Sequence, residues 1–141
     1  MTTARQTTAV AIGTRAVLIE GAPGTGKSSL ALGLIDRGAV LIGDDSLLVE
    51  PKDGQLVVRP HPNTHGLLEV RNLGLVPFPV REEAIAALVV SLDAQAPRYI
   101  EEAGTTAIEG IALPLVHLTP HGAILPIIVE LALARFGLTP G

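Results

Sequence analysis

The stretch "GAPGTGKSS", Gly21 to Ser29, decides the fold class of this 141-residue chain. It completes the pattern Gly-x-x-x-x-Gly-Lys-Ser, in which glycines let backbone N–H groups turn inward around a phosphate. The apolar run "RAVLIE" precedes it, and "SSLALGLIDRG" follows with apolar residues at helical spacing. A strand, a glycine-rich loop and a helix in this order predict a phosphate-binding loop. The residues expected to hold the nucleotide are Gly21, Ala22, Pro23, Gly24, Thr25, Gly26, Lys27, Ser28 and Ser29.

Two side chains of this loop have defined chemistry toward a nucleoside triphosphate. Lys27 is expected to reach the outer phosphates, and the Ser28 hydroxyl to ligate Mg²⁺. Asp44 and Asp45 end the apolar run "AVLIG", so a strand beside the loop would bring them to the metal. One of the two carboxylates can hold metal-bound water while the other accepts a proton from an attacking hydroxyl. Both are candidate catalytic residues and Asp45 is a candidate metal ligand; a polar strand end that caps the next turn is the alternative.

A second pair of charged residues lies in "LLEVRNLG". Glu69 and Arg71 stand two apart on an expected strand, so both side chains would point to one face. Glu69 is a candidate metal ligand, and Arg71 could neutralise charge on a transferred phosphoryl group. On spacing alone, a cross-strand ion pair fits these two residues equally well.

The remaining pattern predicts an α/β domain with several hairpins and two main helices, spanning residues 1–141 as one unit. "TTAVAI" and "RAVLIE" form a hairpin around Gly13-Thr14, and a second hairpin turns at Asp53-Gly54. "REEAIAALVVSLD" is interpreted as a short helix that runs into a strand. A last helix is expected from Ile127 to Phe136, after Pro126 in its first turn.

Composition excludes several function classes. The 10 lysines and arginines are outnumbered by 14 acidic residues and aromatic residues make up 2 %, which argues against nucleic-acid binding. No cysteine is present, so a disulfide frame and a thiolate nucleophile are excluded. Neither a signal-peptide core nor a run long enough to span a bilayer occurs, and a cytoplasmic protein is predicted. The 48 % hydrophobic content fits self-association or a dense monomer core.

The histidines do not indicate a metal site, and the sequence does not fit other common classes of nucleotide-using enzyme. His61 and His65 flank Pro62, which prevents the helix that would align them on a metal, while His117 and His121 are interpreted as strand-end or loop residues. The GTPase motifs Asn-Lys-x-Asp and Asp-x-x-Gly are absent from the sequence. Small-molecule kinases usually need several arginines in lids, and basic residues are few here.

Three runs together resemble a known family: "AVLIEGAPGTGKSSLALGLIDRGAVLIGDD", "GLLEVRNLGL" and "LPIIVELA". From about Gln6 onward the chain resembles the catalytic domain of bacterial HPr kinase/phosphorylase, in a short form without the N-terminal domain. The resemblance implies a P-loop fold related to phosphoenolpyruvate carboxykinase and a hexamer. It also implies ATP- and Mg²⁺-dependent phosphorylation of a serine on an HPr-like phosphocarrier, and removal of that phosphate by phosphorolysis.

The resemblance also implies residue roles. Lys27 would hold the ATP phosphates, Ser28 and Glu69 would bind Mg²⁺, and the Asp44-Asp45 pair would supply the general base. Arg71, and the Arg98 of "APRYIEE", match basic positions near the transferred phosphate.

Three departures from the family pattern bear on activity. Gln6 stands where the family has a histidine, and Asn72 stands where it has a glycine. The segment before the last helix, "TPHGAIL", lacks the basic residues that the family uses for dephosphorylation. We therefore expect kinase activity to be retained where phosphorylase activity is lost, or both activities to be weak. An ATP-binding sensor that has lost transfer activity and a small-metabolite kinase are the competing hypotheses.

Overall fold

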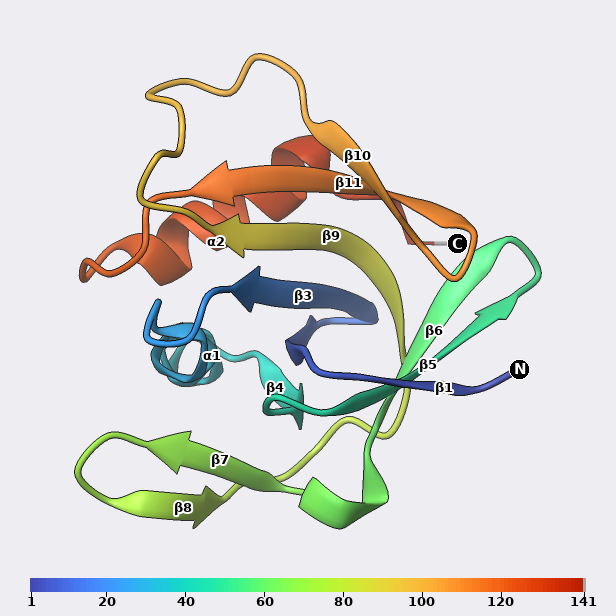
Figure 1. Ribbon diagram of the computed structural model, residues 1–141, viewed down its shortest axis with the longest axis vertical. Coiled ribbons are helices and arrows are strands. Elements are labelled where there is room, and N and C mark those ends of the chain that lie inside the picture. Colours follow the sequence, from blue (N-terminus) through green and yellow to red (C-terminus); the bar gives the residue numbers. More distant parts are fainter. Residues whose placement is uncertain (141) are drawn as a thin grey trace.

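The computed structural model describes residues 1–140 and shows a curled mixed sheet with two α-helices (Figure 1). The elements in chain order are β1 (Thr3–Arg5), β2 (Thr8–Ile12), β3 (Arg15–Gly21), α1 (Lys27–Asp36), β4 (Val40–Gly43), β5 (Leu47–Lys52), β6 (Gln55–Pro60), the 3₁₀ turn η1 (Pro62–Thr64), β7 (Leu67–Val70), β8 (Gly74–Pro77), β9 (Ala84–Leu92), β10 (Gly104–Ile108), β11 (Ile111–Leu118) and α2 (Leu125–Phe136). The predicted α/β class with two main helices is confirmed.

The main sheet has nine strands and branches at β9. Its order is β1-β5-β6-β9-β3-β2-β4, and β11 also pairs with β9 and carries β10 on its outer side. β9 is parallel to both β3 and β11, whereas β2 is antiparallel to β3 and to β4. The predicted antiparallel strand beside the phosphate-loop strand is therefore confirmed. β7 and β8 form a separate hairpin.

The central strands are buried on both faces, which explains their apolar composition. On β3, Val17 and Ile19 pack with both helices, whereas Ala16 and Leu18 pack on the side of β5 and β6. β9 is buried in the same way, so its sequence shows no alternation between apolar and polar residues. The predicted short helix in "REEAIAALVVSLD" is wrong, because a doubly buried strand and a buried helix share this apolar pattern.

The predicted hairpins and helix ends are confirmed in their main features. Gly13 turns between β2 and β3, and Asp53 and Gly54 turn between β5 and β6, all three with positive φ. α1 begins at Lys27, after Gly26 in the left-handed region, and α2 begins at Leu125 rather than at Ile127. The two helices approach closely, because a Cβ on Gly33 would lie 2.5 Å from the Pro126 ring.

The functional edge of the sheet is the one at which β3, β4, β9 and β11 end. The arrows of β3, β9 and β11 point to the left of Figure 1, and β4 runs in the same sense as β3 because both are antiparallel to β2. The loops that follow these four strands therefore lie at one edge of the sheet. These loops carry the phosphate loop, the Asp44-Asp45 pair and the connection to α2. Ligands of α/β proteins bind at such carboxyl ends of parallel strands.

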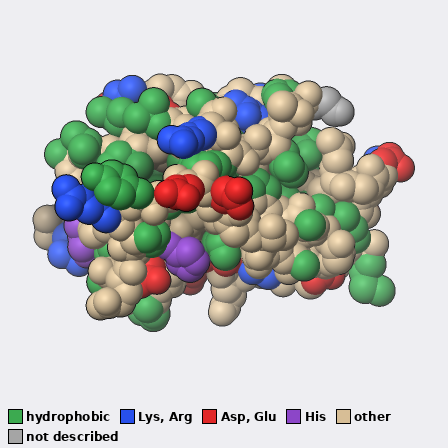
Figure 2. Space-filling view, turned by 90° about the horizontal axis from the view of Figure 1, so that it is seen from above, with side chains coloured by type: hydrophobic (Ala, Val, Ile, Leu, Met, Phe, Trp, Pro, Cys, Tyr) green, Lys and Arg blue, Asp and Glu red, His purple; other side chains and the backbone are tan. Residues whose placement is uncertain are grey.

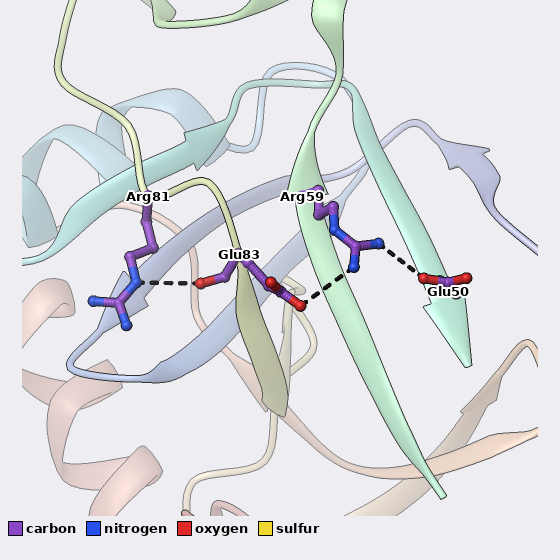
Figure 3. Close-up of polar contacts among 4 residues, drawn as sticks. All are labelled: Glu50, Arg59, Arg81 and Glu83. Atoms are coloured by element: carbon purple, nitrogen blue, oxygen red, sulfur yellow. Dashed lines mark hydrogen bonds and ion pairs between the residues drawn. The ribbon is translucent and has the colours of Figure 1, made fainter. Parts of the chain in front are cut away.

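Ion pairs away from this edge tie β5, β6 and the start of β9 together (Figure 3). Arg59 donates to Glu50 at 2.9 Å and to Glu83 at 3.2 Å, while the Arg81 side chain donates to the Glu83 backbone carbonyl. The hydrogen bond from Arg59 holds the pKa of Glu50 below its ordinary value, and the pKa of Arg59 is raised in return.

Over the described residues, neither helix has the length and apolar content needed to cross a membrane.

Candidate functional site

A cleft of about 820 Å³ lies at the functional edge, and most of the residues singled out from the sequence line it. The lining residues among them are Pro23, Gly24, Gly26, Lys27, Ser28, Ser29, Asp44, Asp45, Glu69 and Arg71. Gly21, Ala22 and Thr25 belong to the same loop without lining the cleft. Three separate segments of the chain thus supply phosphate-binding and acidic groups to one space.

The phosphate loop has the backbone that its glycines predict. Gly24 and Gly26 have φ values of 84° and 90°, which L side chains rarely adopt. The Lys27 ammonium donates to the carbonyl oxygens of Gly21, at 3.0 Å, and Ala22, at 3.4 Å. The lysine therefore lies over its own loop, within the span that an outer phosphate would occupy.

The Asp44 carboxylate accepts hydrogen bonds from three different parts of the chain. Its Oδ1 accepts hydrogen bonds from the Ser28 hydroxyl at 2.7 Å and the Thr8 hydroxyl at 3.0 Å. Its Oδ2 accepts one from the Glu69 backbone N–H at 3.0 Å. A carboxylate offers roughly four acceptor positions, and three are in use here. Asp44 thereby joins the phosphate loop, β2 and β7.

The Asp45 carboxylate differs from that of Asp44 in its hydrogen bonding. Its backbone N–H donates to the Thr8 hydroxyl at 3.1 Å, and its φ of 61° turns the chain sharply after β4. Its side chain is exposed in the cleft and makes no hydrogen bond to residues 1–140. The pair therefore diverges: Asp44 is fixed by donors, and Asp45 presents an unengaged carboxylate.

The expectation that Glu69 and Arg71 share one strand face is wrong, although both line the cleft. β7 ends at Val70, so Arg71 belongs to the turn that leads to β8. Asn72 follows in that turn with a φ of 74°, a conformation that asparagine tolerates well. Within the described chain, Glu69 and Arg71 form no ion pair with each other.

Arg98 lies outside this cleft. It stands in the connection between β9 and β10, exposed, with its guanidinium 5.4 Å from the centre of the Tyr99 ring. It lines a second cleft of about 730 Å³, together with His117 and residues of α2. Figure 2 shows hydrophobic, basic and histidine side chains gathered at the same end of the molecule. Gln6 is exposed before β2 and lines neither of the two clefts.

Sequence reasoning passed over two residues of the site. Thr8 is fully buried and contacts both aspartates; a hydroxyl inside the apolar strand "TTAVAI" was the available signal. His121 lines both clefts, although its sequence context indicates no more than a loop.

The residues of the cleft fit Mg²⁺ that arrives with a nucleotide. No three His, Cys, Asp or Glu side chains of residues 1–140 converge on a common point, so a dedicated all-protein cage is not preformed there. Mg²⁺ prefers one or two carboxylates completed by water and substrate phosphates. The Ser28 hydroxyl with Asp44 behind it, and Glu69 nearby, match that preference.

Comparison with known proteins places this geometry in a family. A family model described as the HPr Serine kinase C-terminal domain matches residues 2–138. The HPr kinase/phosphorylase of Chlorobium chlorochromatii is 32 % identical over 135 residues, which cover 85 % of this chain and 40 % of that protein. The HPr kinase/phosphorylase of Clostridium beijerinckii is 48 % identical over 60 residues, 43 % of this chain and 20 % of that protein. The chain thus spans less than half the length of these relatives.

A solved structure agrees with the sequence comparisons. The Hpr(Ser) kinase/phosphatase from Coxiella burnetii superposes with a TM-score of 0.84 and 26 % identity, over 94 % of this chain and 89 % of that one. Its coverage of both chains extends the similarity beyond the phosphate loop to the whole fold. The chain therefore belongs to the HPr serine kinase C-terminal domain family.

Proposed function

We propose that this chain is an ATP- and Mg²⁺-dependent kinase that phosphorylates a serine hydroxyl on an HPr-like phosphocarrier protein. The observation that carries the proposal is the 2.7 Å hydrogen bond between Ser28 and Asp44, which joins the phosphate loop to the acidic pair inside one cleft. The names of the relatives supply the acceptor, since each is an HPr kinase. A cytoplasmic location remains a prediction from the sequence, and a hexameric assembly remains a prediction from the resemblance.

The phosphate loop and its lysine hold the nucleotide in this proposal. The backbone N–H groups of residues 21–29 cradle the phosphates, and Lys27 exchanges its carbonyl partners for the outer phosphate oxygens. Bound Mg²⁺ would be held by Ser28 and Glu69 and would neutralise charge on the phosphates. Asp44 fixes the Ser28 hydroxyl in the required direction.

Asp45 is the proposed general base. Asp44 already accepts three hydrogen bonds, whereas the Asp45 carboxylate is exposed and unengaged. As the serine oxygen forms its bond to the γ-phosphorus, the bond from that phosphorus to the bridging oxygen breaks and ADP leaves. The serine proton passes to Asp45 and then to solvent. This assignment exchanges the metal role first expected of Asp45 for a proton-transfer role.

In this proposal Arg71 would neutralise charge on the moving phosphoryl group; its position in the lining of the same cleft, at the β7–β8 turn, supports this role. Arg98 would need its loop to move before it could take part, because it lines the neighbouring cleft. This separation, with the exposed Gln6, favours the second candidate function, an ATP-binding sensor without transfer activity.

Labelling with γ-labelled ATP and a purified HPr-like carrier distinguishes these functions. We expect label on the carrier serine with the wild-type chain. We expect a loss of about a hundredfold or more with Lys27→Ala. Lys52→Ala changes the other lysine of the chain, in the distant β5–β6 hairpin, and should leave labelling unchanged.

The other outcomes are equally distinct. Binding of ATP without transfer supports the sensor, and label on a small metabolite supports a metabolite kinase. Incubation of the phosphorylated carrier with Mg²⁺ and inorganic phosphate tests the reverse activity, for which we expect little pyrophosphate. Absence of ATP binding by the wild-type chain would remove the proposal altogether.

A further inference from the structure

The loop between β11 and α2 brings a histidine into the nucleotide cleft that no role above uses. His121 and Gly122 have φ values of 69° and 100°, so two consecutive left-handed residues reverse the chain toward the phosphate loop. Histidine adopts this region more readily than most residues other than glycine. The turn brings His121 to the lining of the cleft.

The imidazole of His121 lies against the phosphate loop itself. A Cβ on Gly26 would come 3.3 Å from its Nδ1 and 3.4 Å from its Cε1. Gly26 immediately precedes α1 and belongs to the run of backbone amides that is expected to surround the phosphates. A donor atom placed beside Gly26 is thus beside the expected path of the nucleotide.

The hydrogen bonding of His121 differs from that of the other histidines. His61 accepts from the Asn63 backbone N–H at 3.1 Å, His65 contacts Glu82 at 2.6 Å, and His117 lies 3.5 Å from Asp93. Within residues 1–140, His121 has neither a hydrogen bond nor an ion pair to protein. Its ring nitrogens remain available to a ligand.

The charge of the cleft favours such a ligand contact. Two cationic side chains, Lys27 and Arg71, line it against three carboxylates, so the protein alone brings little positive charge to a triphosphate. An N–H donor that reaches a phosphate oxygen forms a charge-assisted hydrogen bond, about twice as strong as a neutral one. The segment "TPHGAIL" has no arginine for this purpose, and His121 is its one side chain with such a donor.

We infer that His121 is a nucleotide-contacting residue whose imidazole N–H donates to a phosphate oxygen of the nucleotide held by the phosphate loop. The inference rests on the proposed function, because it requires that a nucleotide binds in this cleft. It extends that function with a contact from the α2 side of the cleft, which the sequence did not indicate.

The test compares two substitutions at position 121. His121→Gly removes the imidazole and accepts the left-handed backbone without strain. His121→Asn also tolerates this backbone, and its amide nitrogen, an N–H donor, is bonded to Cγ as Nδ1 is in histidine. Calorimetry with MgATP should show about tenfold weaker binding for His121→Gly, and His121→Asn should recover most of the loss. His117→Ala removes the other exposed histidine of the second cleft and should bind as the wild type does.

Inorganic triphosphate separates a phosphate contact from a base contact. We expect the same relative loss with inorganic triphosphate as with MgATP; a loss seen with ATP alone would overturn the phosphate assignment. In the carrier assay, the KM for ATP should rise with kcat nearly unchanged. Equal affinities of His121→Gly and wild type would refute the inference and leave the proposed function standing. No binding by the wild type would remove both.

Discussion

Two groups of carboxylates in this molecule are stabilised in opposite ways. Glu50 and Glu83 flank the Arg59 guanidinium on β5, β6 and the start of β9, where opposite charges meet directly (Figure 3). Asp44, Asp45 and Glu69, at the carboxyl ends of the strands, have no ion pair within residues 1–140. Within the same residues, only the Asp44 carboxylate of the three accepts hydrogen bonds, from the hydroxyls of Thr8 and Ser28 and from the Glu69 backbone N–H.

The contrast shows which acidic residues serve the fold and which remain available for chemistry. An arginine partner cancels charge and gives a surface carboxylate a structural role of modest strength. Hydroxyl and amide donors orient a carboxylate but leave its negative charge in place, ready for a divalent cation or a proton. The acidic residues of the cleft are therefore the ones on which activity should depend.

The largest effect on kcat is expected for Asp45→Asn. An amide cannot accept the serine proton, and loss of a general base lowers kcat by about 10²- to 10⁴-fold. Asp53→Asn is the matched control, since Asp53 also has a positive φ, of 54°, but lies in the β5–β6 turn. Carrier phosphorylation measures both variants. If Asp45→Asn phosphorylates the carrier as fast as the control Asp53→Asn does, Asp45 is not the base.

The second largest effect is expected at the Thr8 hydroxyl, which contacts both Asp44 and Asp45. Thr8→Val keeps the shape of the side chain but removes one donor to Asp44 and one acceptor for the Asp45 N–H. We expect the free energy of unfolding to fall by about 1–3 kcal/mol, since buried polar groups lose their partner. Urea unfolding measures the change, and kcat should fall as well because the carboxylates lose their orientation.

A matched control isolates that effect. Thr105→Val alters an exposed threonine of β10 and should change neither quantity measurably. If Thr8→Val matches the wild type in both stability and kcat, the hydroxyl does not organise the aspartates.

The smallest effect is expected at the paired carboxylates. Because Arg59 holds the pKa of Glu50 below its ordinary value of 4.5, the pair adds stability above that pH. This contribution is lost as the pH falls through the lowered pKa. Arg59→Met should therefore be less stable than wild type at neutral pH, and the difference should shrink below about pH 4.5. Denaturant midpoints across pH measure it.

The salt dependence of stability and the control variant Arg135→Met complete the test of Arg59→Met. High salt should reduce the difference at neutral pH, because exposed charges are screened. Arg135→Met, which removes an arginine stacked on Phe136, should show no such dependence on pH. A stability difference for Arg59→Met that persists at low pH would show that packing, and not charge, explains the effect.

The sequence predicted the local parts of this molecule better than their assembly. The phosphate loop, the turns at Gly13 and Asp53-Gly54, and both helices follow from residue types that act over a few neighbours. β9 was misread in part, because burial on both faces removes the alternation that marks a strand. The α/β class was predicted from the pattern of elements and the HPr kinase family from the resemblance, and both are confirmed.

The site shows the same limit. Asp44 and Glu69 were singled out by position, but the backbone N–H of Glu69 that fixes Asp44 depends on how the β7–β8 hairpin packs. Arg98 lies within the long connection between β9 and β10, whose path residue spacing does not define. His121 meets Gly26 through tertiary structure alone, since the two are distant in the chain.

The tight crossing of the two helices restricts which residue can stand at position 33. A side chain there would meet the Pro126 ring, so any residue larger than glycine would have to push α1 and α2 apart. α1 starts at Lys27, and α2 starts at Leu125, shortly after His121, so the start of each helix lies at or near a residue that lines the candidate cleft. A substitution at this crossing would therefore displace helices that begin at the cleft, without changing any residue that lines it.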